Sequence, residues 1–417
     1  MANKKPTSTK KNSISKTTTN YTKKAVKEAK KVAKHNPKAF LIILIVAVLV
    51  AVLGGGAYYF LVLRKNQSES TSQETSEHSH SESSSEQVIT TEGMSIHFLE
   101  LGNRYTGDST YIKAGDTDIL IDAGSRQSSA GTIKAYVDQY CTDGILEYVI
   151  ATHAHQDHIA GFLGTTTVSG IFDSYKINTL IDFSQTKATS QLYNNYVAKR
   201  EAKLESGDIL HHYTALDCVE ETSGAQKVYT IADSITMTIL DQKYYHETSN
   251  DENDHSVCTL FSQGNNHYLF TGDLESKGET SLVELNPTLP HCVLFKGGHH
   301  GSPTSNTDAL LNKITPDNVC ICCCAGHDEY TYDPRTQFPS RDALTRILNH
   351  TENIYVTTVS PDGHSTYESM NGNITFRCED GVNYTITGSN NSTKLVDTEW
   401  YETRKILWQQ ADEGDNT

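Results

Sequence analysis

The feature that most constrains this chain is the hexapeptide His153-Ala-His155-Gln-Asp157-His158, which directly follows an apolar run at residues 145–150. The run has the length and the Ile, Val and Tyr content of a buried strand. His153 and His155 are two residues apart, so they point to the same side of an extended backbone. Imidazole suits zinc, iron or manganese, and carboxylate suits harder ions. The hexapeptide therefore predicts a metal-binding loop at a strand end; a His-rich surface loop is the alternative.

Two later segments carry groups of the same kind. Asp273 follows a strand-like run at residues 267–270, and His299-His300 stand within Gly-Gly-His-His-Gly-Ser. Together with His-x-His-x-Asp-His, these segments resemble the signature of the metallo-β-lactamase superfamily. The doubled His followed by Gly-Ser is similar to the extracellular hydrolase domain of ComEC-type competence proteins and to the phosphorylcholine esterase branch. The resemblance covers roughly residues 93–380.

This resemblance implies an α/β (α+β) fold, the four-layer αββα metallo-β-lactamase sandwich. It implies two divalent metal ions, which we expect to be zinc, with manganese as the alternative. His153 and His155 would bind the first ion. The full set of expected metal ligands is His153, His155, Asp157, His158, Asp273 and His299, and the expected catalytic residues are Asp157, Asp273 and His300.

Three points of this assignment stay open. The match to the family pattern favours His299 over His300 as the ligand, with His300 contacting the phosphate or supporting the site. Many relatives supply one more His to the first ion, and the only close doublet in the intervening sequence is His211-His212, which stands in a different sequence setting. Asp122, in Asp122-Ala-Gly124, matches an early family Asp that supports the metal loop without binding the ion.

The first 92 residues differ in composition from the rest. Residues 1–38 contain twelve Lys and one Glu, which predicts a basic cytoplasmic tail without a packed core. Residues 39–63 contain no charged side chain, and about 20 apolar residues suffice for a helix to cross a bilayer. Residues 64–92 are rich in Ser and Glu and predict an extracellular linker.

The Lys-rich side of a membrane span stays in the cytoplasm. We therefore expect a single-pass cell-membrane protein whose N-terminus is cytoplasmic and whose remaining chain is extracellular. A cleaved signal peptide is the alternative for the apolar segment. The hydrolase domain is expected at residues 93–388, and residues 389–417 are expected to form an added helix or tail.

Two further segments lead to structural expectations. Residues 190–205 carry apolar side chains at helical spacing and end at Ser-Gly-Asp, which predicts an amphipathic helix. Cys320-Ile-Cys322-Cys323-Cys324 has no second Cys or His pair at zinc-finger spacing, so we interpret the run as buried thiols that act as small apolar side chains.

Charge bears on the substrate. From residue 93 onward, 21 basic and 44 acidic side chains leave a net charge of −23. DNA affinity comes largely from Lys and Arg that neutralise phosphates, so this charge disfavours general DNA binding. Two metal ions that lower the pKa of water toward about 7 supply a hydroxide nucleophile. We therefore expect a phosphodiesterase acting on a small or cell-envelope phosphodiester. The alternatives are a competence-type extracellular nuclease and a non-catalytic, metal-stabilised surface binding protein.

Overall fold

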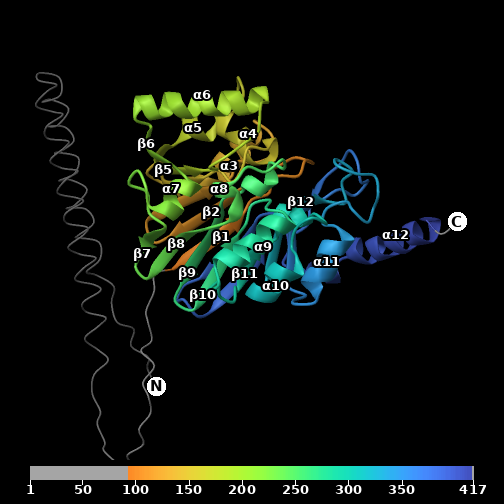
Figure 1. The fold of residues 1–417 in the computed structure, drawn as a ribbon. Coiled ribbons are helices and arrows are strands. Elements are labelled where there is room, and N and C mark those ends of the chain that lie inside the picture. Colours follow the sequence, from red (N-terminus) through yellow and green to blue (C-terminus); the bar gives the residue numbers. More distant parts are fainter. Residues whose placement is uncertain (1–92, 416–417) are drawn as a thin grey trace, which may run out of the picture. The chain divides into compact units, whose positions relative to one another are not determined.

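The computed structural model describes residues 93–415, which Figure 1 shows as a coloured ribbon. The expected cytoplasmic tail, membrane span and linker, at residues 1–38, 39–63 and 64–92, lie outside the described residues. Within residues 93–415, no helix combines the length and the apolar character needed to cross a bilayer. The described chain forms two eight-stranded sheets, with helices in the connections between their parallel strands.

The first sheet has the strand order β16-β15-β1-β2-β3-β4-β5-β6. Its strands are β1 (Met94–Phe98), β2 (Thr110–Ala114), β3 (Thr117–Ile121), β4 (Ile145–Ile150), β5 (Lys176–Asp182), β6 (Ile209–Thr214), β15 (Ile374–Cys378) and β16 (Tyr384–Gly388). Strands β3 to β6 are parallel, and parallel neighbours need crossover connections. The crossovers hold the helices α3 (Ser129–Val137), α4 (Gln156–Leu163), α5 (Ile171–Ser174) and α6 (Gln191–Ser206).

The second sheet has the order β14-β13-β12-β11-β10-β9-β8-β7. Its strands are β7 (Val228–Ala232), β8 (Ile235–Leu240), β9 (Cys258–Gln263), β10 (Asn266–Phe270), β11 (Leu294–Lys296), β12 (Val319–Ala325), β13 (Ile354–Val359) and β14 (Glu368–Ser369). Strands β10 to β13 are parallel. Their crossovers hold α9 (Ser276–Leu285), the short helix η2 (Gly298–Gly301), α10 (Asp308–Ile314) and α11 (Arg341–Leu348).

The two sheets pack against each other through aromatic side chains. Phe98 of the first sheet stacks on Phe270 of the second with ring centroids 6.1 Å apart. Tyr268 of the second sheet meets the ring edge of Phe376 in the first at 5.2 Å. One cluster of buried side chains contains residues of both sheets, and the crossover helices lie on their outer faces in Figure 1. This mixed α/β arrangement with two large sheets is consistent with the expected αββα sandwich.

Helix α6 shows how local sequence sets an element's ends. The side chain of Ser190 accepts a hydrogen bond from the backbone N–H of Tyr193, which caps the first turn. Gly207 ends the helix with a φ of 76°, a left-handed conformation that glycine adopts without steric cost. Tyr196 is the residue of this helix that is fully buried. The helix expected at residues 190–205 is confirmed.

Two remaining short helices and one long one complete the chain. They are α7 (Ala215–Glu220), α8 (Lys243–His246) and α12 (Glu399–Asp415), with one-turn helices η1 (Asn253–His255) and η3 (Leu395–Asp397) beside them. Helix α12 lies within the segment for which an added helix or tail was expected.

The cysteine run forms most of strand β12, in which every residue is buried. All nine cysteines of the chain lie in the described part, and each is a buried free thiol. Burial raises the pKa of Cys320 and Cys323 far above the ordinary thiol value, so both stay protonated thiols near neutral pH. The interpretation of these thiols as apolar filling agrees with the structure.

Candidate metal centre

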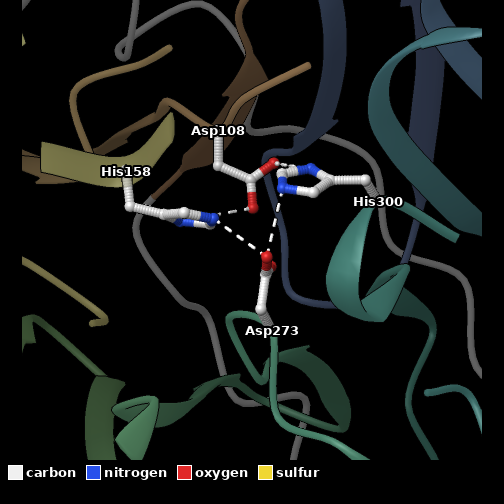
Figure 2. Close-up of side chains that lie close together, drawn as sticks. All are labelled: Asp108, His158, Asp273 and His300. Atoms are coloured by element: carbon white, nitrogen blue, oxygen red, sulfur yellow. Dashed lines mark hydrogen bonds and ion pairs between the residues drawn. The ribbon is translucent and has the colours of Figure 1, made fainter. Parts of the chain in front are cut away.

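Four buried side chains from distant parts of the sequence converge at the strand ends. Asp108, His158, Asp273 and His300 each offer one ligand atom, and these atoms all lie within 4.8 Å of one another. Figure 2 shows the four side chains pointing toward a common centre. Asp108 precedes β2, His158 lies on α4 after β4, Asp273 follows β10, and His300 lies in η2 after β11. The packing of the two sheets thus brings loops from both of them to one point.

The pair His153 and His155 lies next to this cluster. Nε2 of His153 is 3.1 Å from Nδ1 of His155, and the ring centroids of His153 and His158 are 4.1 Å apart. Two nitrogens bound to one tetrahedral zinc ion at about 2.1 Å each lie roughly 3.4 Å apart. The two imidazoles therefore stand near the spacing of a chelating pair, and their binding of an ion stays a prediction.

Asp122 orients the loop that carries the hexapeptide. Its carboxylate accepts hydrogen bonds from the backbone N–H and the hydroxyl of Thr152, both at 2.8 Å. The same carboxylate lies 2.7 Å from Nδ1 of His158. With Nδ1 held by Asp122, Nε2 of His158 points to Asp273 at 3.1 Å. A carboxylate in this place fixes the tautomer and direction of a metal-binding imidazole, which is the supporting role expected for Asp122.

A left-handed backbone turn at His299 and His300 places their imidazoles apart, with ring centroids at 6.0 Å. His299, His300 and Gly301 have φ values of 47°, 54° and 81°, and left-handed backbone at a non-glycine residue costs about 1–3 kcal/mol. Nδ1 of His300 donates to the carbonyl of Cys322 at 2.8 Å, so its Nε2 is free to bind a metal. That Nε2 lies 3.1 Å from Asp273.

His299 lies farther from the centre. Its Nε2 is 3.8 Å from Asp273, while its Nδ1 lies 3.5 Å from Glu275. The side chain of His299 is 17% exposed, whereas that of His300 is 1% exposed. His300 is therefore the more buried of the two imidazoles and the nearer to Asp273, whereas His299, the residue favoured from the sequence as a ligand, lines the cavity.

Asp157 stands between the centre and solvent. Its carboxylate lies 3.4 Å from Nε2 of His300 and accepts a hydrogen bond from the hydroxyl of Tyr330 at 3.1 Å. Burial opposes ionisation of Asp157, but His300 and His158 outweigh it and hold the pKa of this carboxyl well below its usual range. Asp157 is therefore a carboxylate at neutral pH, the form that binds cations.

Two residues of the site, Asp108 and Lys296, had no place in the sequence expectation. Lys296 ends β11 and forms a buried ion pair with Asp108; its ammonium also lies 3.7 Å from Asp273. Burial lowers the pKa of Lys296, but the two carboxylates outweigh this and raise it above the ordinary value. The available signals were a Gly-Asp step before a strand and a single Lys at the end of an apolar run. Neither Asp108 nor Lys296 stands at a ligand-like spacing from another metal-binding residue, so the sequence pattern did not indicate them.

The His211-His212 doublet makes its contacts outside the cluster. It belongs to β6, and Nε2 of His212 lies 2.9 Å from Asp182. Asp182 also pairs with Arg200 at 2.7 Å. The structure thus gives His212 a partner of its own and supplies no third imidazole to the His153 and His155 pair from this strand.

The chemistry of the cluster fits bound cations. Both carboxylate oxygens of Asp108, Oδ1 of Asp273 and Nε2 of His300 are buried and have no hydrogen bond of ordinary geometry. Buried polar atoms without partners cost free energy, and divalent ions would satisfy carboxylate and imidazole groups together. The residues present therefore fit a metal centre.

A cavity of about 450 Å³ opens onto this centre. Its lining includes His155, Asp157, Asp273, His299, Arg126, Gln156, Asn253, Glu329 and Tyr330. Arg126 pairs with Glu329 at 3.1 Å and lies over the ring of Tyr105 at 3.6 Å. A cavity of this size takes a small ligand, and its lining includes His155, Asp157 and Asp273, three of the side chains that could hold the metal.

The fold and the Asp/His cluster define a mixed α/β protein with a candidate metal site. A family model described as "Anti-Pycsar protein Apyc1" matches residues 94–302. This range is just over half of the 417 residues, and the chain belongs to that family.

Comparisons with individual proteins give shorter or weaker matches. Recombination protein 2 of Haemophilus influenzae is 39% identical over 70 residues, 17% of this chain and 8% of that protein. Competence protein ComA of Neisseria gonorrhoeae is 37% identical over 67 residues, 16% of this chain and 10% of that protein. The matches thus take in a tenth or less of these relatives.

Among solved structures, the metallo-β-lactamase fold protein YhfI of Bacillus subtilis is similar at a TM-score of 0.38 and 11% identity. That comparison covers 66% of this chain and 100% of YhfI.

Proposed function

We propose that this protein is a metal-dependent hydrolase that cleaves a small phosphodiester. The observation that carries the proposal is the convergence of Asp108, His158, Asp273 and His300 within 4.8 Å. The adjacent pair, His153 and His155, stands 3.1 Å apart. Two groups of candidate ligands side by side suit two divalent ions, the arrangement of many phosphoester hydrolases, and His155 and Asp273 bring both groups to the cavity.

The proposed ligands follow from the directions of the side chains. His153 and His155 would hold one ion, Asp157, His158 and His300 the other, and Asp273 would contact both. Asp108 lies beside the second group and pairs with Lys296. Zinc suits this mixture of imidazole and carboxylate, and manganese is the alternative. When bound, such ions supply an activated water and neutralise the negative charge that develops at phosphorus.

Other residues of the cavity would bind and orient the substrate. His299 reaches the cavity wall with its side chain partly exposed, so its imidazole is placed to donate a hydrogen bond to a phosphate oxygen. Tyr330 holds Asp157 through its hydroxyl and borders the same cavity. Burial, with Asp157 nearby, raises the pKa of this phenol, so Tyr330 stays a hydrogen-bond donor at neutral pH.

Cavity size and charge support a small phosphodiester. The cavity of about 450 Å³ matches a ligand of small-molecule size. The net charge of −23 from residue 93 onward repels a polyanion along the rest of the surface. Family membership adds that the protein after which the family is named is an anti-Pycsar protein.

Cleavage of DNA is the second candidate function. The observation that favours it is the 39% identity, over 70 residues, to Recombination protein 2 and the 37% identity, over 67 residues, to competence protein ComA. Single-stranded DNA incubated with the metal-loaded protein separates the two candidates. We expect turnover of small diesters and none of DNA; efficient DNA cleavage would favour the nuclease.

We also propose that residues 39–63 anchor the protein in the cell membrane with the hydrolase outside. The 25 uncharged residues and the twelve Lys that precede them support this placement. Protease added to intact cells should remove the hydrolase domain while leaving the N-terminal tail inside. A hydrolase domain that stays protected until the cells are lysed would contradict the placement.

The test of the hydrolase is elemental analysis of the full-length protein paired with a panel of small phosphodiesters. We expect two ions per chain and turnover that chelation abolishes. His300→Ala should lose one ion and lower kcat/KM on the order of 100-fold or more. His299→Ala should keep both ions and mainly raise KM.

His291→Ala is the matched control for these imidazole deletions. His291 is 49% exposed and pairs with Asp317, so this variant should keep both the ions and the activity. Wild-type protein without bound metal after incubation with zinc or manganese would overturn the proposal. So would a metal-loaded protein that turns over no phosphodiester in the panel.

A further inference from the structure

A second cavity, of about 670 Å³, lies beside helix α12 and outside the family match. Five residues of that helix form one wall: Glu399, Trp400, Thr403, Arg404 and Leu407. The loop at residues 326–337 and the turn between β13 and β14 form the others. We call this cavity the α12 pocket. None of its lining residues belongs to the candidate metal centre, so it requires a separate explanation.

Arg404 is the unusual residue of the α12 pocket. It is only 7% exposed. One end of its guanidinium donates to the side chain of Gln337, but its Nε has no hydrogen-bond partner. No Asp or Glu of residues 93–415 forms an ion pair with Arg404, and burial lowers its pKa to about 10. A buried cation without a counter-ion is strongly unfavourable, so the structure leaves an anion's place open at this guanidinium.

Four acidic residues line the same pocket, and two of them, Asp328 and Asp362, are engaged elsewhere. Asp328 lies 2.8 Å from the ring of His364, and Asp362 accepts backbone N–H groups from His364, Ser365 and Thr366. Glu368 and Glu399 also line the pocket, and none of these four described carboxylates forms an ion pair with Arg404. Because they also line the pocket, they would repel a doubly charged phosphate more than a singly charged carboxylate.

An apolar wall lies next to the guanidinium. The guanidinium of Arg404 lies 5.4 Å from the centre of the Trp400 ring. Leu407 is 36% exposed, and Val359 completes this side. Gly326, with a φ of 77°, keeps the space open: a Cβ there would lie 3.0 Å from Nε1 of Trp400 and 3.1 Å from a guanidinium nitrogen of Arg404.

We propose that the α12 pocket binds a small organic monocarboxylate with an aromatic or similarly flat apolar body. The carboxylate would pair with Arg404, since guanidinium and carboxylate match in shape and charge. The flat body would lie against Trp400. The loop behind the pocket also carries Tyr330 to Asp157, so an occupant would contact the far side of the loop that borders the metal centre.

Tryptophan fluorescence of the full-length protein provides the test. The chain has two tryptophans, Trp400 and Trp408, and both lie on α12, so tryptophan emission reports on this helix alone. Benzoate is the probe, and acetate, benzamide and inorganic phosphate are its comparisons. We expect saturable binding of benzoate and at least tenfold weaker binding of each comparison. Absence of saturable benzoate binding, or equal binding of neutral benzamide, would overturn the proposal.

Two variants with the same change of charge separate the pocket from the surface. Arg404→Gln removes the buried cation, and Lys405→Gln removes its exposed neighbour on the same helix. Measured by calorimetry, benzoate should bind Arg404→Gln at least tenfold more weakly than wild type and Lys405→Gln equally well. Equal affinity in Arg404→Gln would contradict the assignment.

Folding of the variants is checked without ligand. Because Arg404 has no counter-ion, Arg404→Gln should melt at or above the temperature of the wild type. If that variant unfolds early instead, Trp400→Leu replaces it, since it removes the flat wall and keeps the charge. Trp400→Leu should also weaken benzoate binding at least tenfold, and unchanged binding would overturn the proposal.

Discussion

At the residue scale, His97 shows how a buried imidazole outside the metal centre sets a pH dependence. Its Nδ1 lies 2.8 Å from the hydroxyl of Tyr136 and its Nε2 lies 2.9 Å from the hydroxyl of Ser95. The side chain is almost fully buried. Burial, and to a lesser extent the charge of Arg377, lowers the pKa of His97 to about 4. The folded protein therefore keeps this ring neutral at pH values where an unfolded chain protonates it.

The sign of the effect follows from proton linkage. Between about pH 6.5 and pH 4 the unfolded chain binds a proton at His97 that the folded chain does not. Stability supplied by the neutral ring is present above this window and is lost as the pH falls through it, by about 3 kcal/mol in total. His97→Gln should show a shallower loss of unfolding free energy over the same range.

Urea unfolding at a series of pH values measures this difference. His291→Gln, on an exposed imidazole, serves as the matched control and should keep the wild-type slope. Parallel curves for wild type and His97→Gln would show that the ring does not cause the dependence.

Individual residues of the site also differ in whether the sequence could identify them. His153, His155, Asp157 and His158 were identifiable because they crowd into one hexapeptide with a ligand spacing. Asp108 was not, because it lies far upstream and reaches the centre through backbone bonds: its N–H donates to the carbonyl of Asp157, and its carbonyl accepts from Gly124. Such long-range pairing leaves no local pattern.

At the element scale, helix α4 depends on a glycine at its contact with the first sheet. A Cβ on Gly161 would overlap the carbonyl oxygen of Ala123, which already accepts the Gly161 N–H at 3.0 Å. Gly161→Ala must therefore push α4 away from the loop that Asp122 begins. We expect a loss of unfolding free energy on the order of 3 kcal/mol, and weaker metal binding, because α4 carries Asp157 and His158.

Thermal unfolding and zinc titration measure the two effects. Gly414→Ala is the control, since a Cβ at that helical position meets nothing within 4 Å; it should be neutral or slightly stabilising. A Gly161→Ala protein as stable as wild type would show that α4 can shift without cost.

Elements differed in how far their sequences determined them. Helix α6 was predictable since Ser190 and Gly207 mark its ends and its apolar side chains recur at helical spacing. The left-handed turn through His299 and His300 was not. Nothing in a His pair signals positive φ, and tertiary packing holds the strained backbone in place. The positions of the two imidazoles relative to Asp273 could therefore not be predicted from the sequence.

At the scale of the whole molecule, the packed sheets enclose an excess of negative charge. Asp108, Asp122, Asp157 and Asp273 are all buried or nearly so at one place, with Lys296 as the buried ammonium beside them. Cations bound there stabilise the folded state by about 4 kcal/mol when free metal is a thousandfold above Kd. Chelation should therefore lower the melting temperature, and added zinc should restore it.

Differential scanning calorimetry with and without chelator measures this effect on the full-length protein. Calcium added in place of zinc serves as the control. It should not restore the melting temperature, since hard ions prefer sites made only of oxygen ligands. If chelator leaves the melting temperature unchanged in protein that contains metal, the bound ions do not stabilise the folded state.

Two sheets with outer helices could be expected from the alternation of strand-like and helical segments and from the family resemblance. The pairing of β1 with β15 could not. Its two strands hold side chains 278 positions apart in contact, and short alternating strands give no indication of distant partners. The strand order β15-β1-β2 could therefore be known only from the structure.

The pairing of β1 with β15 also determines how much of the chain must be synthesised before the first sheet can be completed. Strand β1 has β2 on one edge, but its other edge is filled only by β15, which in turn pairs with β16. A nascent chain released before residue 374 would therefore leave this edge of β1 open, a known route to aggregation. Premature termination late in the message should yield insoluble or rapidly degraded fragments, even when every residue of the metal centre has already been synthesised.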